Sequence, residues 1–182
     1  MKNFFVTSVK SLRQTGTISP SSKFLIKKML RNIDFKSNQI IIEFGAGNGC
    51  ITETILEKMP KTNTLHVFEL NDKFYQLCQQ KFNRFPNIKI HNENALEFEK
   101  VIELKADEKV DYVISSLPLT LLKKEDINTL MRRVKKRLNP NGYFIQYQYS
   151  LDKLSYFKKQ FTYVDLSCTL INLPPAFVYT CR

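Results

Sequence analysis

The sequence predicts an α/β fold in which helices alternate with the strands of one doubly wound, seven-stranded sheet. Two observations predict it. Short apolar runs rich in β-branched and aromatic residues alternate with stretches of helical periodicity along most of the chain. Between the last two runs the chain has no helical pattern, only Asn172-Leu-Pro-Pro175, so these runs should form a hairpin at the sheet edge with one strand antiparallel.

The first strand and the helix after it have the clearest patterns. Ile40, Ile41 and Ile42 form the β-branched run expected of a central parallel strand that is covered on both faces. From Ile51 to Met59 the apolar residues recur at helical spacing. By the same criteria, strands are expected near 39–44, 65–69, 88–91, 110–115, 142–149, 161–167 and 175–181. Helices are expected near 3–13, 21–33, 49–59, 72–84, 95–104, 123–138 and 152–160.

The composition limits the chain to one catalytic or binding domain. With 182 residues, of which 43% are hydrophobic, it can bury a full core but has little left for a second one. We expect residues 1–36 to form N-terminal amphipathic and basic helices, and residues 37–182 to form the main domain. The four cysteines are widely spaced and lack a Cys-x-x-Cys or His pairing, so we expect no metal site and no disulfide framework.

The chain shows no sign of crossing a membrane or of export. No apolar run approaches the roughly 20 residues of a membrane span. The N-terminus has charges where a signal peptide would need an uninterrupted apolar segment. We therefore expect a cytoplasmic protein.

A glycine turn joins the first strand to the helix that follows it. Glu43 ends the strand, and Gly45, Gly47 and Gly49 follow at alternate positions, where the backbone can take positive φ and approach a ligand. No Gly-Lys-Ser/Thr ends the turn, which excludes a triphosphate-binding loop. The turn is closer to a dinucleotide fingerprint, with the acidic Glu69 roughly 20 residues on. However, its third glycine comes too early for Gly-x-Gly-x-x-Gly.

The spacing Glu-x-Gly-x-Gly-x-Gly resembles the first motif of class I S-adenosylmethionine-dependent methyltransferases. The resemblance implies a Rossmann-like fold, S-adenosylmethionine as cofactor and S-adenosylhomocysteine as its product. It also implies that Glu69 accepts hydrogen bonds from the ribose. Asn94 stands where the family usually has an Asp beside the adenine. The implied cofactor residues are Glu43, Gly45, Ala46, Gly47, Gly49, Glu69, Leu70, Asn71, Asn94, Ala95 and Ser115.

Four further segments together look like the bacterial phospholipid N-methyltransferases. They are Thr15–Ser22, Ser115–Leu119, Gln146–Tyr149 and Asn172–Ala176. The resemblance implies methylation of phosphatidylethanolamine towards phosphatidylcholine, with ornithine lipid as the alternative acceptor of some relatives. It also implies that the N-terminal helix covers the cofactor cleft. The substrate residues expected on this basis are Leu117, Pro118, Leu119 and Asn172.

The N-terminal segment has the pattern of a helix that lies on a membrane surface. The net charge is +11, and basic residues up to Lys36 far outnumber the single acidic Asp34. Apolar residues fall on one helical face with basic residues beside them, as in a helix at an anionic bilayer interface. The alternative is a surface helix that packs on the domain. We expect a monomer that binds peripherally to the inner face of the cell membrane. The residues expected to contact the membrane are Phe4, Phe5, Val9, Lys10, Leu12 and Arg13.

Other functions remain open from the residues. The ribosomal RNA adenine dimethyltransferases share a related motif, but there an aromatic residue that stacks on the flipped-out base follows the proline, whereas this chain has Leu119. We therefore do not expect nucleic acid as a partner. A small-molecule methyltransferase, or a cofactor-binding protein without catalysis, would fit the same fold. The basic run Arg132–Arg137 could bind phosphates or be a solvated helix face.

Two tyrosines and two histidines complete the candidates. Tyr147 and Tyr149 are the candidate catalytic residues, because a phenol oxygen or ring can orient an ammonium. Tyrosines on a strand also commonly pack in the sheet, and neither is expected to be an essential base. His66 and His91 lie in or at the end of strands and are interpreted as structural.

Overall fold

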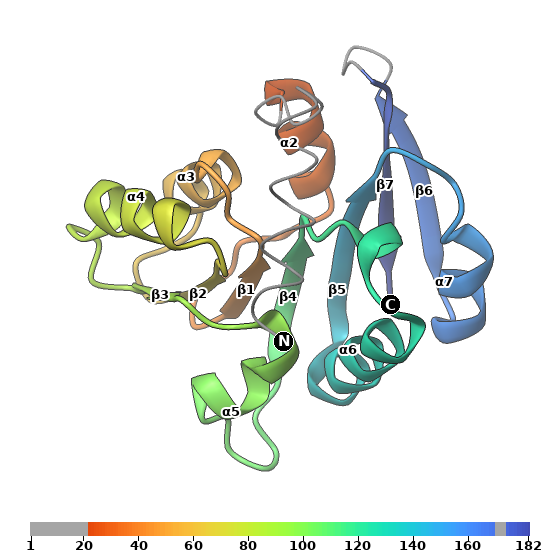
Figure 1. The fold of residues 1–182 in the computed structure, drawn as a ribbon. Helices are drawn as coiled ribbons and strands as arrows, with labels where there is room; N and C mark the ends of the chain where they lie inside the picture. The colour runs from red at the N-terminus through yellow and green to blue at the C-terminus, as the bar shows by residue number, and fades with distance from the viewer. Residues whose placement is uncertain (1–21, 170–173) are drawn as a thin grey trace.

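The computed structural model describes residues 22–169 and 174–182, which form one seven-stranded sheet (Figure 1). The strand order is β3-β2-β1-β4-β5-β7-β6. Only β7 runs antiparallel to its neighbours β5 and β6. The order reverses between β1 and β4, which is where ligands bind in sheets of this type. The strands are β1 (Ile40–Phe44), β2 (Thr64–Phe68), β3 (Ile88–His91), β4 (Val110–Ser115), β5 (Leu138–Gln148), β6 (Val164–Thr169) and β7 (Ala176–Cys181).

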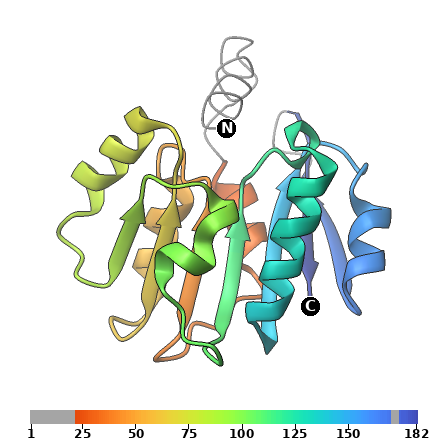
Figure 2. The ribbon, with the colours of Figure 1, turned by 60° about the horizontal axis from the view of Figure 1, so that its bottom comes forward.

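Helices cover both faces of the sheet (Figure 2). On one face, α2 (Lys23–Leu30), α3 (Cys50–Lys58) and α4 (Asp72–Phe82) contribute to a first core cluster. On the other face, α5 (Phe98–Ile102), α6 (Lys124–Arg137) and α7 (Leu154–Gln160) build a second cluster. The side chains of the central strand β1 point alternately to the two faces of the sheet, so Ile41 belongs to the first cluster and Ile42 to the second.

The predicted fold class is confirmed, including the hairpin at the sheet edge. The expected helix over 95–104 is divided into η1 (Ala95–Glu97) and α5. The strand expected from residue 142 begins at Leu138, with a register shift between Val110 and Tyr112 of β4. Gly142 allows this irregular pairing, because a Cβ there would lie 2.2 Å from the carbonyl oxygen of Asp111.

The helix α2 belongs to the core. Leu25 and Met29 are fully buried in the first cluster. The Ser22 hydroxyl oxygen caps the helix by accepting from the backbone N–H of Leu25 at 3.2 Å. Residues 23–30 of the expected N-terminal helices therefore pack into the core of the main domain. The helix expected over 3–13 lies outside the described residues. Within the described ranges, no helix is both long enough and apolar enough to span a membrane.

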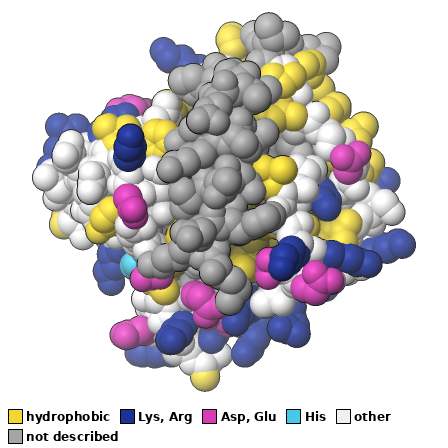
Figure 3. Space-filling view, in the orientation of Figure 1, with side chains coloured by type: hydrophobic (Ala, Val, Ile, Leu, Met, Phe, Trp, Pro, Cys, Tyr) yellow, Lys and Arg dark blue, Asp and Glu magenta, His cyan; other side chains and the backbone are white. Residues whose placement is uncertain are grey.

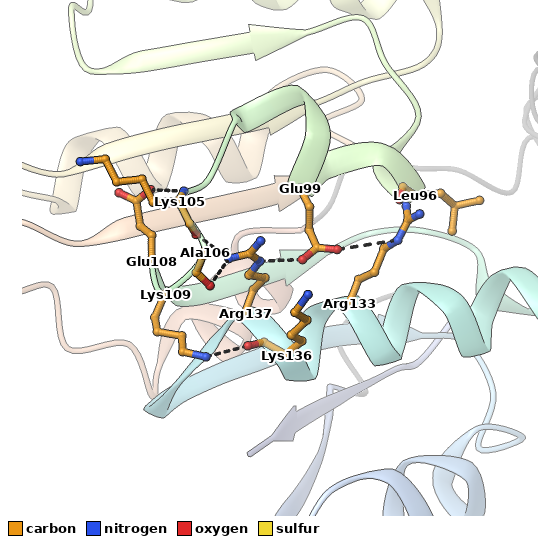
Figure 4. A network of polar contacts seen from close by, with 9 residues as sticks. All are labelled: Leu96, Glu99, Lys105, Ala106, Glu108, Lys109, Arg133, Lys136 and Arg137. Atoms are coloured by element: carbon orange, nitrogen blue, oxygen red, sulfur yellow. Dashed lines mark hydrogen bonds and ion pairs between the residues drawn. The ribbon is translucent and has the colours of Figure 1, made fainter.

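The basic run on α6 is partly committed to internal contacts (Figure 4). Arg137 donates through Nε to Glu99 at 2.6 Å and through its terminal nitrogen to the carbonyl oxygens of Lys105 and Ala106. Arg133 donates to the carbonyl oxygen of Leu96. These bonds tie α6 to the η1–α5 segment. The expectation of a solvated helix face is therefore wrong for Arg133 and Arg137, whereas Arg132, Lys135 and Lys136 are exposed.

Candidate functional site

The glycine turn between β1 and α3 has a backbone that only glycine adopts easily. Gly45, Gly47 and Gly49 have φ values of 80°, 56° and 80°. At Gly49, a Cβ would lie 2.6 Å from the Phe82 ring, so this glycine lets α4 pack against the turn. At Gly47, a Cβ would meet nothing within 4 Å. The turn is therefore closed on the side of Gly49 and open at Gly47, where a ligand can approach the backbone.

Glu69 holds the open part of the turn. One carboxylate oxygen accepts from the N–H of Gly47 at 2.8 Å, and the other accepts from the N–H of Asn71 at 2.8 Å. Asn71 in turn caps α4 by accepting from the N–H groups of Lys73 and Phe74. With the half-buried Leu70 between them, these residues stand at the carboxyl end of β2, beside β1. The structure thus brings the predicted ribose ligand against the glycine turn.

Glu43 places a buried carboxylate beneath the same turn. It is fully buried, and one oxygen accepts from the Thr52 hydroxyl at 2.7 Å. The other oxygen, Oε1, has no hydrogen-bond partner among the described residues. Burial raises the pKa of Glu43 to about 7, although the hydroxyl of Thr52 acts in the opposite direction. An unpartnered buried carboxylate oxygen fits a ligand that carries a cationic or N–H donor group.

The remaining predicted cofactor residues stand at the carboxyl ends of the neighbouring strands. Ala46 is buried in the turn itself. Asn94 caps η1 by accepting from the N–H of Leu96 at 3.0 Å, and Ala95 packs into the second cluster. Ser115 pairs with Phe44 at the end of β4 and accepts from the N–H of Leu117 at 3.3 Å. The ends of β1 to β4 therefore supply one continuous edge.

The loop after β4 forms the second wall of the site. The N–H of Ser116 donates to the carbonyl oxygen of Phe44 at 2.8 Å, which keeps the loop against the glycine turn. A Cβ at Gly45 would lie 3.5 Å from the Leu117 side chain. The carbonyl oxygen of Leu117 accepts from the side-chain amides of Gln146 and Gln148 on β5, at 3.1 Å and 2.9 Å.

Not every predicted substrate residue reaches this wall. Pro118 precedes η2 (Leu119–Leu121) and is half-buried. Leu119, expected to contact the substrate, is instead fully buried in the second cluster with Ile127 and Leu130. The short helix η2 turns its side chain into the core, so the surface of the site is built without it. Asn172 and the predicted membrane residues of the N-terminal segment lie outside the described residues.

The two candidate tyrosines stand at the end of β5. Their ring centroids are 5.7 Å apart in an edge-to-face arrangement. Tyr147 is partly buried against the first cluster, and Tyr149 is 36% exposed. They therefore lie near the ends of the strands that form the site, with Tyr149 at the surface.

The histidines pair with each other across β2 and β3. Nδ1 of His66 and Nε2 of His91 are 3.1 Å apart, and the rings are stacked. Burial lowers the pKa of His66 to about 4 and also lowers the pKa of His91, which favours neutral rings. This agrees with a structural role. Over residues 22–169 and 174–182, no cluster of three or more His, Cys, Asp or Glu could hold a metal ion.

Four residues of the site were not among the candidates from the sequence: Thr52, Ser116, Gln146 and Gln148. Gln146 and Gln148 have a visible signal, because two amides at alternate positions of a buried strand share one face and need partners. Thr52 has no such signal, because single hydroxyl residues are common at helix starts. Ser116 lies within the Ser115–Leu119 segment that carries the resemblance, but nothing in that segment singles out its hydroxyl.

Comparisons with known proteins agree with this geometry. A family profile described as a methyltransferase domain matches residues 41–142. The chain is 29% identical to the ornithine lipid N-methyltransferase of Singulisphaera acidiphila, over 100% of this chain and 97% of that protein. It is also 29% identical to the ribosomal RNA small subunit methyltransferase A of Borreliella burgdorferi, but over 65% of this chain and 43% of that protein.

A solved structure shows the same fold. Human methyltransferase-like protein 13, in complex with SAH, has a TM-score of 0.68 and 14% identity to this chain. The match covers 86% of this chain and 81% of that chain.

Proposed function

Because the chain belongs to the methyltransferase domain family, we propose that it uses S-adenosylmethionine to methylate the amine of a membrane lipid. The cofactor prediction is confirmed by the family and by similar structures that contain S-adenosylhomocysteine. The lipid acceptor is the proposed part. The observation that carries it is the similarity to an ornithine lipid N-methyltransferase along the whole of this chain.

The residues of the site fit this cofactor. The unpartnered Oε1 of Glu43 fits the α-ammonium group of the cofactor. At Gly47 the backbone is open, so the cofactor can lie close to the glycine turn there. Glu69, which already holds the N–H of Gly47, is the proposed ligand of the ribose. When bound, the cofactor supplies an electrophilic methyl group: the amine lone pair forms the N–C bond, the C–S electron pair returns to sulfur, and the product ammonium releases a proton to water. The protein mainly has to align and desolvate the two partners.

The relatives favour an ornithine-type head group as the acceptor to test first. The ornithine lipid enzyme is matched along 97% of its length, whereas the ribosomal RNA enzyme is matched along only 43%. Phosphatidylethanolamine, the acceptor expected from the sequence motifs, also presents a primary amine at a bilayer surface. We therefore propose a lipid amine, with ornithine lipid ahead of phosphatidylethanolamine.

A membrane-facing site is supported by the side chains around it. Phe24 at the start of α2, and Tyr149 and Leu151 after β5, are 56%, 36% and 45% exposed. Figure 3 shows apolar side chains gathered along the upper right edge of the face it presents, with basic side chains spread around the periphery. With the amphipathic pattern of residues 3–13 and a net charge of +11, this supports a peripheral protein on the anionic inner face of the cell membrane.

Transfer of isotopically labelled methyl from the cofactor to defined vesicles tests the proposal. Separate vesicles would contain ornithine lipid or phosphatidylethanolamine in an anionic background, with ribosomal RNA in a parallel reaction. We expect label in ornithine lipid, and loss of that label in the Glu69→Ala variant. Label in RNA alone, or in neither lipid, would refute the lipid acceptor while leaving the cofactor assignment in place.

A further inference from the structure

Three buried side-chain oxygens of the described residues lack a hydrogen-bond partner: Glu43 Oε1, Ser116 Oγ and Gln146 Oε1. They come from the carboxyl ends of the adjacent strands β1, β4 and β5. The strand register aligns these ends, because Phe44 pairs with Ser115 and Ser115 pairs with Gln146. Unpartnered buried polar atoms are few in folded proteins. Their concentration at one edge indicates groups that a ligand completes.

Of these three groups, the Ser116 hydroxyl belongs to the loop after β4, and it lies on the side of that loop that faces the glycine turn. Side chains alternate across a strand, so Ser116 continues the face of Ile114, which belongs to the same cluster as Ile41. Glu43 lies two residues after Ile41 and points to that face as well, towards Thr52 of α3. A Cβ at Gly45 would lie 3.7 Å from the Cβ of Ser116. The hydroxyl thus stands beside the turn that receives the cofactor.

The carbonyl oxygen of Leu117, in the same loop, already accepts two hydrogen bonds. Leu117 O accepts from both Gln146 Nε2 and Gln148 Nε2, and a carbonyl oxygen has two lone pairs. Gln146 Nε2 also donates to the carbonyl oxygen of Tyr147 at 2.7 Å, which fixes the orientation of its amide. The two glutamines therefore position the loop and leave the Leu117 carbonyl no capacity for a substrate N–H. Gln146 Oε1 belongs to the opposite face of the sheet, because Phe144 two residues before it lies in the second cluster. The Ser116 hydroxyl is therefore the unpartnered acceptor that this loop offers on the face of the glycine turn.

We propose that Ser116 Oγ accepts an N–H hydrogen bond from the methyl-accepting amine and so aims the nitrogen lone pair at the cofactor. Gln146 and Gln148 are positioning residues, since they act through the Leu117 carbonyl. The inference rests on the proposed N-methylation. It has a specific consequence: a single acceptor needs one N–H, which neutral primary and secondary amines have and a neutral tertiary amine lacks.

The Ser116→Ala variant tests this on vesicles that contain unmethylated, monomethylated or dimethylated ornithine lipid. We expect kcat/KM to fall about tenfold to about hundredfold on the first two acceptors, the range of one lost hydrogen bond, and less than about twofold on the dimethylated acceptor. Cofactor affinity and Tm should stay at the wild-type values, because the hydroxyl has no partner within the described residues. The Ser116→Thr variant, which keeps the hydroxyl, should retain most of the wild-type activity. Ser167→Ala on β6 is the matched control.

The outcomes separate the positioning of the amine from a structural role. Wild-type kcat/KM of Ser116→Ala on the unmethylated acceptor would overturn the proposal, as would a loss accompanied by weaker cofactor binding or a lower Tm. Gln148→Leu should instead slow transfer to all acceptors alike, because it releases the loop. If the wild-type protein methylates another nitrogen acceptor and no lipid, the proposed function fails, and the same Ser116→Ala comparison on that acceptor decides the present inference.

Discussion

Glu43 and Thr52 meet through a 2.7 Å hydrogen bond that uses only one of the two carboxylate oxygens. This leaves Oε1 buried without a partner among the described residues, directly beneath the glycine turn. The ionised form of this carboxyl group is thus poorly stabilised by its neighbours, and burial raises its pKa from 4.5 to about 7. A ligand with a cationic or N–H donor group would supply the missing partner of Oε1.

Cofactor binding should therefore depend on pH. Because the fold favours the protonated carboxyl, the stability contributed by Glu43 is fully present below pH 4.5 and is lost as pH rises through about 7. A bound cation favours the ionised form, so binding below about pH 7 must release a proton. We expect affinity for S-adenosylmethionine to fall by up to about tenfold per pH unit below pH 7. Calorimetry in buffers of different ionisation enthalpy would measure both the affinity and the released proton. A flat profile would show that Glu43 does not meet the ammonium.

Removing the Glu69 carboxylate should weaken cofactor binding and loosen the turn. Glu69→Ala loses the proposed ribose contact, a charge-assisted bond of roughly 1.5–3 kcal/mol, which corresponds to an affinity loss of about tenfold to about hundredfold. It also leaves the N–H of Gly47 without its acceptor. The control is Glu53→Ala, which removes an exposed carboxylate paired with Lys81. Equal affinities of the Glu69 variant and the wild type would mean that the ribose lies elsewhere.

Two glycine substitutions should separate packing from ligand access. Gly49→Ala places a Cβ 2.6 Å from the Phe82 ring at a φ of 80°, so we expect a loss of stability of about 2–3 kcal/mol. Gly47→Ala meets no atom within 4 Å and should cost only about 1–2 kcal/mol from its positive φ. Its main effect should be on cofactor affinity, because the new methyl group occupies the open side of the turn. Denaturant unfolding and calorimetry on both variants would check this order, and a reversed order would contradict the assignment of the open side.

The N-terminal segment should carry much of the membrane affinity. Replacing Phe5, Val9 and Leu12 with Ser removes the apolar stripe of the expected amphipathic helix. Binding to anionic vesicles in a flotation assay should be lost, with cofactor affinity unchanged. A variant with Lys10→Ala alone should bind more weakly, by about 1 kcal/mol for one basic residue near the surface. Wild-type vesicle binding by the triple variant would exclude the segment as the membrane anchor.

The sequence was sufficient for the parts of the site that depend on local patterns. The β-branched run of β1, the glycine spacing and the carboxylate at Glu69 each depend on a few neighbouring residues. The position of Leu119 could not be predicted this way, because an apolar side chain after a proline fits a substrate wall as well as a core. The bonds from Gln146 and Gln148 to Leu117 join residues about thirty positions apart, and they arise only from the register of β4 and β5.

The sheet ends at β6, and α2 places two cations against that last strand. Lys28 Nζ donates to the carbonyl oxygen of Cys168 at 2.7 Å, and Arg31 pairs with Asp165. An outermost strand whose carbonyl is occupied by a lysine is a poor template for a strand from a second molecule. The helix α2 therefore also disfavours aggregation through the edge of the sheet. This protection would matter for a protein that is concentrated on a membrane surface.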